Sequence, residues 1–166
     1  MDIDLNLREM AKDDYRFIIH SWARSFSVSR VISKLHMNEW LACKSYAAIL
    51  EQRLPAMSGI IACNPEDETQ IFGYLVFDDH ESAATIHFVY VKDYLRNNGI
   101  GSLLSCTLIE KSINSSYPEY GFLKQVLKKE ISFKPFHLLG IVINDPKEKR
   151  ETYAHSPQIS GTVPRH

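Results

Sequence analysis

The amino-acid sequence predicts an α/β (α+β) fold, in which helices flank one mixed, mostly antiparallel sheet. Helical periodicity precedes and follows three short apolar runs joined by polar turns, and such runs are typical of an antiparallel meander. The length of 166 residues and the hydrophobic content of 45% are those of one domain with one sizeable core. The expected order of elements is β-α-α-β-β-β-α-(α)-β, which matches neither a Rossmann repeat nor a helical bundle.

The first third of the chain is expected to hold one strand and two helices. Apolar and polar residues alternate in Ile3–Leu7, which indicates a short first strand. Apolar positions recur at helical spacing from Tyr15 to Phe26, and either of the two preceding aspartates can cap that helix. A second helix is expected over about Met37–Leu54, where apolar positions stand among good helix formers, and the proline that follows marks its end. The intervening residues 27–36 fit a helix or a loop.

The centre of the chain changes to strand patterns. The runs Ser58–Cys63, Gln70–Phe77 and Ala84–Val91 are short and apolar, and the two segments that join them have turn chemistry. Helical periodicity resumes over Ile100–Lys111. These residues therefore predict a three-stranded meander followed by a helix.

The C-terminal part is less regular. Residues 114–118 form a polar break, Gly121–Glu130 fits a short basic helix, and Phe136–Ile143 has the apolar character of a buried strand. The residues beyond this run are polar. We therefore expect one domain over residues 1–145 and a polar tail over residues 146–166.

Composition and charge exclude several classes of protein. A net charge of −1 argues against a protein dominated by nucleic-acid binding, and no apolar run is long enough to cross a membrane. The cysteines Cys43, Cys63 and Cys106 include no CxxC pair and the histidines no HxxxH pair, so neither a disulfide framework nor a metal site is expected. The acidic N-terminus lacks the features of a secretory signal, and we expect a cytoplasmic protein.

One segment carries a chemical signal: a strand runs into a polar loop with two glycines, and the loop opens directly onto an amphipathic helix. The first N–H groups of a helix have no intrahelical partner, and the helix dipole favours negative charge there. Gly99 and Gly101 let a diphosphate approach the backbone closely. Arg96 adds a positive charge and Ser102 a hydroxyl donor, so the segment predicts an anion site.

Two familiar phosphate loops do not fit this segment. A P-loop requires a lysine next to the last glycine, and Gly101 is followed by a serine. A dinucleotide-binding fingerprint requires a third glycine, where this chain has Leu104, and the preceding strands look antiparallel.

A third kind of loop fits better. The segment resembles the coenzyme A loop of the GNAT superfamily of N-acetyltransferases, which has the pattern Arg/Gln-x-x-Gly-x-Gly/Ala. The strand before the loop and the upstream order of elements are also similar to this family, and the resemblance covers about residues 3–113. The alternative is a tight strand-to-helix turn that binds nothing. The matching loop is Arg96-Asn97-Asn98-Gly99-Ile100-Gly101, preceded by the strand end Val89-Tyr90-Val91.

This resemblance implies acetyl-CoA, or another acyl-CoA, as the cofactor. Its pyrophosphate would lie on the backbone N–H groups of Asn98 through Ser102, and its pantetheine would run along the preceding strand like an added strand. The N–H of Val91 or a neighbour could polarise the thioester carbonyl. The implied cofactor-binding residues are Val89, Tyr90, Val91, Arg96, Asn97, Asn98, Gly99, Ile100, Gly101 and Ser102.

The implied reaction needs a base for the ammonium proton and an acid for the leaving thiolate. The family often has a carboxylate on this strand, where the sequence has His87, whose imidazole titrates near pH ~6.5 when unperturbed. His87 is the candidate base, and the alternative is a half-buried strand histidine. Tyr153 is the candidate acid. Tyr117 begins a segment like the family's Tyr-x-x-x-Gly-Phe motif, but it follows Gly101 too soon for a helix, a strand and a second helix to intervene.

The sequence therefore predicts an N-acetyltransferase that acts on a primary amine of a small molecule or a protein. An alternative is a catalytically silent module of the same fold that binds a protein partner. A nucleic-acid-binding protein that uses the basic residues 124–150 is a third reading, which the near-neutral charge disfavours. The short chain also resembles acetyltransferase-like proteins of bacteriophages and mobile elements, which implies a host or virion protein as acceptor. A homodimer stays open.

Overall fold

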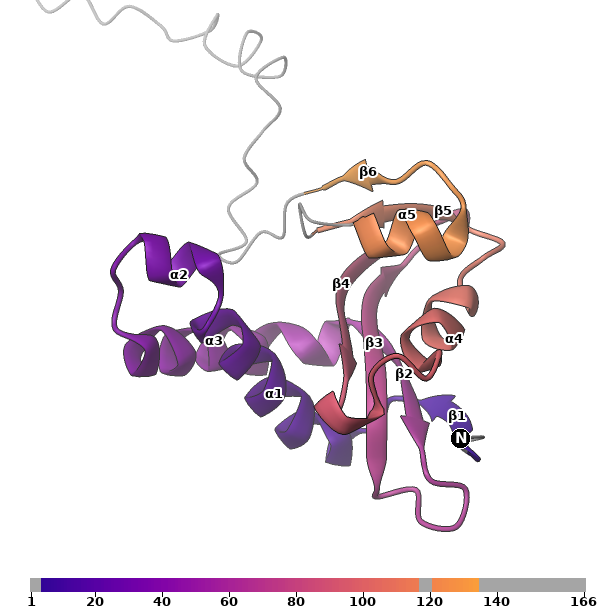
Figure 1. Cartoon of the computed structure of the whole chain (residues 1–166), viewed down its shortest axis with the longest axis horizontal. Helices are drawn as coiled ribbons and strands as arrows, with labels where there is room; N and C mark the ends of the chain where they lie inside the picture. The colour runs from indigo at the N-terminus through magenta and orange to yellow at the C-terminus, as the bar shows by residue number, and fades with distance from the viewer. Residues whose placement is uncertain (1–3, 117–120, 135–166) are drawn as a thin grey trace, which may run out of the picture. The chain divides into compact units, whose positions relative to one another are not determined.

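A six-stranded mixed sheet forms the centre of the molecule (Figure 1). The structure is a computed structural model that describes residues 4–116 and 121–134. Strands β1 to β4 are antiparallel to their neighbours, whereas β5 is parallel to β4 and β6 is parallel to β5. The strands follow the chain across the sheet: β1 (Asn6–Glu9), β2 (Ser58–Cys63), β3 (Ile71–Asp79), β4 (Ala83–Val91), β5 (Ser112–Ser115) and β6 (Ser132–Phe133).

Helices cover both faces of this sheet. One face carries the first three helices, and the other face carries the last two (Figure 1). This arrangement confirms the predicted fold class, a mixed and mostly antiparallel sheet flanked by helices. The helices are α1 (Tyr15–Ser27), α2 (Arg30–Lys34), α3 (Glu39–Arg53), α4 (Ile100–Cys106) and α5 (Gly121–Leu127).

The two helical layers bury different sets of apolar side chains against the sheet. Ile18 of α1 and Leu50 of α3 are fully buried, and the hydroxyl of Tyr74 in β3 donates to the main-chain oxygen of Ile18. Ile100 and Leu104 of α4 are buried on the other face within a separate core cluster. Each such side chain contributes roughly 1.5–3 kcal/mol through its burial. The loop before α4 is therefore held in place by the first turns of a well-anchored helix.

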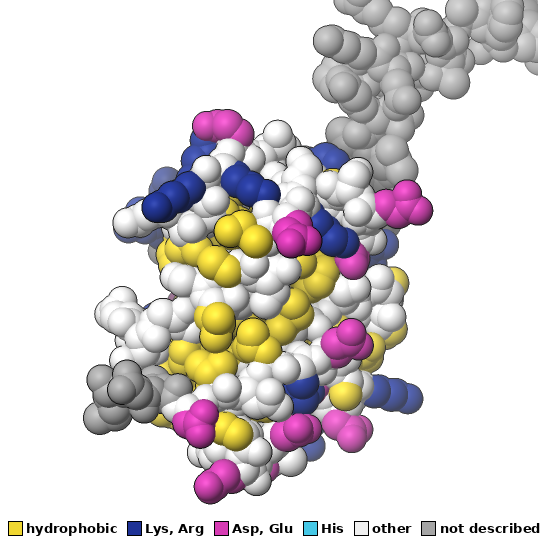
Figure 2. All heavy atoms as spheres, turned by 90° about the vertical axis from the view of Figure 1, so that its right-hand side faces the viewer, with side chains coloured by type: hydrophobic (Ala, Val, Ile, Leu, Met, Phe, Trp, Pro, Cys, Tyr) yellow, Lys and Arg dark blue, Asp and Glu magenta, His cyan; other side chains and the backbone are white. Residues whose placement is uncertain are grey.

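The layer of α4 and α5 exposes apolar side chains on its outer side. Figure 2 shows apolar side chains gathered on this side of the molecule, and Leu103, Ile109 and Phe122 are each close to half exposed. Leu103 and Phe122 belong to α4 and α5 themselves, and Ile109 lies in the turns after α4.

Local chemistry explains where α1 and α3 begin. Arg8 of β1 makes a two-pronged ion pair with Asp14 (2.7 and 2.8 Å), and the same carboxylate accepts the N–H of Ala11 just before α1. Asn38 caps α3, because its side-chain oxygen accepts the N–H of Leu41 at 3.0 Å. These polar contacts satisfy backbone donors that a helix start would otherwise leave open.

The two helices predicted in the first third agree with α1 and α3, and several other elements differ in their bounds. Strands β2, β3 and β4 lie where three apolar runs were expected, whereas β1 lies closer to the C-terminus than Ile3–Leu7. Residues 27–36, which fitted a helix or a loop, include the helix α2. The helix expected over Ile100–Lys111 ends at Cys106 and continues as turns.

The expected polar break at residues 114–118 is wrong at its start, because strand β5 occupies Ser112–Ser115. Parallel pairing with β4 supplies main-chain hydrogen bonds, and it buries Asn114 and Ser115 although both are polar. Ile113 is the one apolar residue in this strand, so the alternation that reveals a strand is absent from the sequence. The predicted strand Phe136–Ile143 and the boundary between residues 145 and 146 lie outside the described residues and stay predictions.

Candidate coenzyme-binding site

Strand β4 changes its pairing at His87. Up to Ile86 it pairs with β5, and the N–H of Ser116 makes the last of these contacts by donating to the oxygen of Ile86 (2.9 Å). On the other edge, the register with β3 shifts between Val76 and Phe77, which leaves His87 as the extra residue of a β-bulge. Beyond His87, none of the described strands pairs with the second edge of β4.

The direction of the main chain in this open half follows from one hydrogen bond. The N–H of Lys92 donates to the oxygen of Phe72 at 2.9 Å, and antiparallel bonding alternates along the strand. Tyr90 therefore directs its main chain toward β3. Val89 and Val91 direct their N–H and C=O groups toward the open edge, where an extended ligand can pair with them like an added strand.

The loop after β4 needs glycine for two different reasons. Gly99 has φ of +81°, a left-handed conformation that side chains rarely adopt, and it caps α4. Gly101 needs space, because a Cβ there would lie 3.2 Å from Cζ of Phe122 and 3.7 Å from Cγ2 of Val91. The loop thus lies close against the end of the open edge.

The other loop residues shape the backbone. Asn97 is also left-handed, with φ of 66°, and the side-chain amide of Asn98 donates to the oxygens of Leu95 and Arg96, both at 3.2 Å. Residues 96–99 are exposed. The helix α4 begins at Ile100, directly after this polar loop. The N–H groups of its first turn have no intrahelical partner and form a small region of positive potential.

The charged and hydroxyl side chains of the loop lie at its rim. The guanidinium of Arg96 pairs with Asp93 at 2.7 Å, and both side chains are largely exposed. Its Nε also donates a long hydrogen bond to the oxygen of Val91 (3.4 Å). Ser102, in the first turn of α4, is half-buried. An anion at this loop would therefore meet Arg96 with one neighbouring carboxylate.

His87, the candidate base, is buried beside the open edge. Its side chain lies between Ser116 and Asp78, with Nδ1 at 3.0 Å from the serine Oγ and Nε2 at 3.0 Å from a carboxylate oxygen. Burial lowers the pKa of His87 below its usual value; the attraction of Asp78 opposes this shift, and the positive charge of Arg53 adds to it. The imidazole is consequently neutral at neutral pH and able to accept a proton.

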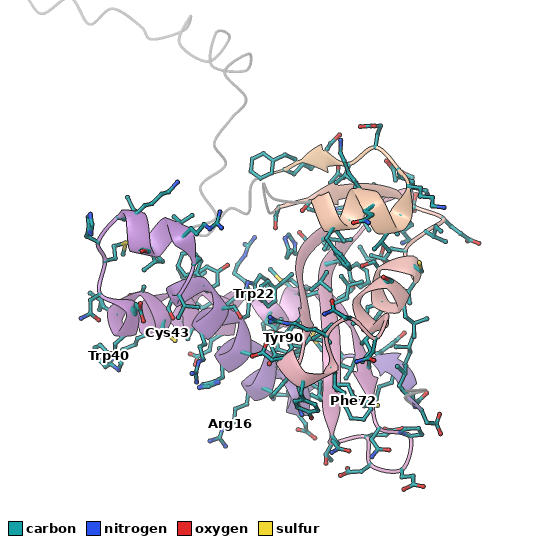
Figure 3. All side chains as sticks on the ribbon, in the orientation of Figure 1. Arg16, Trp22, Trp40, Cys43, Phe72 and Tyr90 are labelled. Atoms are coloured by element: carbon teal, nitrogen blue, oxygen red, sulfur yellow. The ribbon has the colours of Figure 1, made fainter. Side chains whose placement is uncertain are left out.

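Aromatic side chains pack against the open half on the face of the sheet that carries α1. Trp22 of α1 stacks on Phe88 with ring centroids 5.0 Å apart, and Tyr90 stacks on Tyr74 at 5.2 Å. Figure 3 shows Trp22 between α1 and the sheet and Trp40 at the outer end of the helical layer. Trp22 is a buried core residue, whereas Trp40 is 69% exposed.

The sequence did not identify Asp78 and Ser116 as partners of His87. The one hint in the sequence was that polar residues stand at the ends of both strands that neighbour β4. Asp78 was expected to belong to the turn after its strand. Tyr153 and Tyr117 lie outside the described residues, although α4 and β5 precede Tyr117 and α5 follows it.

Two features are absent from the described part of the chain. No group of three or more His, Cys, Asp or Glu side chains there is arranged to hold a metal ion. Helices long and apolar enough to span a membrane are likewise absent from residues 4–116 and 121–134.

Comparison with known proteins identifies the fold. No family model matches the chain, and no curated protein matches its sequence. YycN from Bacillus subtilis, a protein assigned as an acetyltransferase, matches 81% of this chain and 97% of its own with 12% identity and a TM-score of 0.57. A transcriptional regulator from Bacillus halodurans C-125 matches 81% of this chain and 98% of its own with 22% identity and a TM-score of 0.50.

At sequence identities this low, a structural match shows that two proteins share a fold and does not show that they share an activity. A protein from Desulfovibrio desulfuricans, assigned to the GNAT family of acetyltransferases, is among the other solved structures that match. The described part of this chain therefore has the GNAT acetyltransferase fold.

Proposed function

We propose that this protein is an N-acetyltransferase, which transfers an acetyl group from acetyl-CoA to a primary amine of a protein or a small molecule. The observation that carries the proposal is the open half of β4 next to the glycine-bearing loop. Main-chain groups of Val89 and Val91 face an edge free of described strands, and the loop at Gly99–Gly101 begins where that edge ends. The assignment of YycN, which shares the fold, as an acetyltransferase supports the same activity.

The coenzyme would be held mainly by the backbone. The N–H groups from Asn98 to Ser102 would receive the pyrophosphate, and Arg96 at the rim would add charge. Val89 and Val91 would pair with the pantetheine amides. Bound acetyl-CoA supplies the thioester, an activated acyl group.

Three residues would supply the chemistry around that thioester. The N–H of Val91 would donate to the carbonyl oxygen and stabilise the negative charge that develops there. His87, neutral because of its burial, would accept the proton of the attacking amine directly or through water. For the proton of the leaving thiolate we propose Tyr153.

Thermal unfolding with acetyl-CoA tests the proposal. Ligand at 100 times its dissociation constant adds about 2.7 kcal/mol of stability, so the melting temperature should rise. Gly101→Glu should abolish the rise, because it puts a side chain and a negative charge into the loop. Gly121→Glu is the matched control, since a Cβ at Gly121 meets nothing within 4 Å and that helix start lies outside the loop.

The outcomes separate the two classes of function. No rise at millimolar acetyl-CoA contradicts coenzyme binding. A rise without thiol release across a panel of primary amines supports the alternative, a silent module that binds a partner. Thiol release that depends on an added amine supports the transferase.

A further inference from the structure

Side chains from three neighbouring strand segments meet where β4 and β5 part. The imidazole of His87 lies between the hydroxyl of Ser116, 3.0 Å from Nδ1, and the carboxylate of Asp78, 3.0 Å from Nε2. Enzymes that form acyl-serine intermediates arrange a nucleophile, a base and a group that orients the base in this order.

The sheet register produces this arrangement. The N–H of Ser116 donates to the oxygen of Ile86, which places Ser116 beside His87 on the neighbouring strand. Asp78 pairs with Thr85 across the other edge of β4. Since Thr85 precedes His87 by two residues, Asp78 is the diagonal neighbour of the histidine.

The position of Asp78 bears on which ring nitrogen of His87 carries the proton. A carboxylate beside Nε2 favours the tautomer with its N–H there, which leaves the lone pair of Nδ1 for the hydroxyl proton of Ser116. Asp78 and Arg53 are the charged groups that act on the pKa of His87, and burial keeps that pKa below its ordinary value. The base is therefore ready to accept a proton at neutral pH.

The nucleophile is more accessible than the base behind it. Ser116 is half-buried, whereas His87 is 6% exposed. The open edge of β4 begins next to Ser116, and the N–H of Val89 faces that edge. Main-chain donors of this kind stabilise the oxyanion that forms during acyl transfer.

We propose that Ser116 is a nucleophile and that the protein hydrolyses activated acyl esters through an acyl-serine, in addition to acetylating amines. Oγ of Ser116 attacks the carbonyl carbon, and its proton passes to Nδ1 of His87. The bond from the carbonyl carbon to the leaving oxygen breaks, and the leaving group takes the proton from Nδ1. Water then attacks the acyl-serine and gives a proton to Nδ1, which returns it to Oγ as the carboxylic acid departs. Asp78 is a positioning residue.

Hydrolysis of p-nitrophenyl acetate by the full-length protein tests this activity. The probe lacks the coenzyme portion, so the result does not depend on the coenzyme loop. The wild-type protein should release p-nitrophenolate faster than buffer, and acid quenching should trap one acetyl group on the peptide that contains Ser116. Ser116→Ala should reduce release to the buffer rate. Ser112→Ala, at an exposed position of β5, should leave the rate and the trapped acetyl unchanged.

A second variant tests the positioning role. Asp78→Asn should lower the rate by about tenfold or more, because the required tautomer is no longer favoured. It should also move the acid limb of the pH–rate profile to lower pH, since Asp78 raises the pKa of His87. A purely structural role would leave that limb in place, and Asp78→Glu should restore part of the rate. The side chain of Asp78 is 39% exposed, so the variant should remain folded, as a melting curve will check.

The proposal is overturned if Ser116→Ala hydrolyses the ester at the wild-type rate, if wild type does not exceed buffer, or if the acetyl group is trapped only elsewhere. Wild type that binds acetyl-CoA but fails this test keeps the proposed transferase and loses the acyl-serine. Ester hydrolysis that depends on Ser116, in a protein that does not bind acetyl-CoA, keeps the acyl-serine and contradicts the proposed transferase.

Discussion

The two halves of β4 have the same strand geometry but different surroundings. Residues Ala84–Ile86 are paired on both edges, and residues 84–87 are buried. Residues Phe88–Val91 pair with one described strand and are half-buried. The bulge at His87 separates them. A single extra residue therefore divides the strand into a half that holds the sheet together and a half whose main chain is available to a ligand.

The largest expected effect is on stability in the paired half. Ile86→Ala should lower the free energy of unfolding by about 2–5 kcal/mol, because Ile86 is 2% exposed within the core below α4. Val89→Ala, in the half-buried segment, should cost clearly less. Urea denaturation of both variants measures the difference. Equal losses would show that the two halves contribute alike.

Crowding the open half from β3 should have the next largest effect. A Cβ at Gly73 would lie 2.6 Å from the main-chain oxygen of Tyr90 and 3.4 Å from Cα of Val91, so the strand must shift. Gly73→Ala should cost about 1–3 kcal/mol and weaken the binding of acetyl-CoA. Calorimetric titration measures the affinity. Gly121→Ala, in open space, is the control, and unchanged binding in Gly73→Ala would argue against a ligand on this edge.

The bulge itself should make stability depend on pH. The pKa of His87 is lowered in the folded protein by burial, so the unfolded chain binds more protons below its ordinary value of about 6.5. Stability should therefore fall as pH decreases from about 6.5 toward the folded pKa, and become level below it. Melting temperatures between neutral pH and pH ~5 measure this slope. His87→Gln should reduce it, and an unchanged slope would assign the dependence to other groups.

The smallest effect on stability is expected at the rim of the loop. Arg96 and Asp93 form an exposed ion pair, and pairs of this kind contribute about 0–1 kcal/mol. Arg96→Ala should leave the unfolding curve almost unchanged. It should lower the affinity for acetyl-CoA several-fold, and by more at low salt than at high salt. An affinity that does not respond to salt would indicate that Arg96 does not face the phosphates.

The sequence predicted the paired and open halves as one strand, because a bulge leaves no local signature in an apolar run. It predicted the connection from β4 to α4, since Gly99 and Gly101 lie at a defined spacing before a helical pattern, and coenzyme binding by this loop stays a prediction. It missed β5, which holds a single apolar residue, and with it the place where β4 becomes open. Asp78 and Ser116 could not be linked to His87, because strand register between distant segments brings them together.

The stacking of Trp22 on Phe88 has a practical consequence. These two rings are nearly parallel, at 7°, and Phe88 belongs to the open half of β4, whereas the second tryptophan, Trp40, is solvent-exposed at the other end of the helical layer. In Trp40→Phe, the remaining indole emission comes from a buried ring in contact with the strand that would hold the ligand. The protein thus carries an intrinsic fluorescence reporter, which can follow occupancy of that edge in real time without any attached dye.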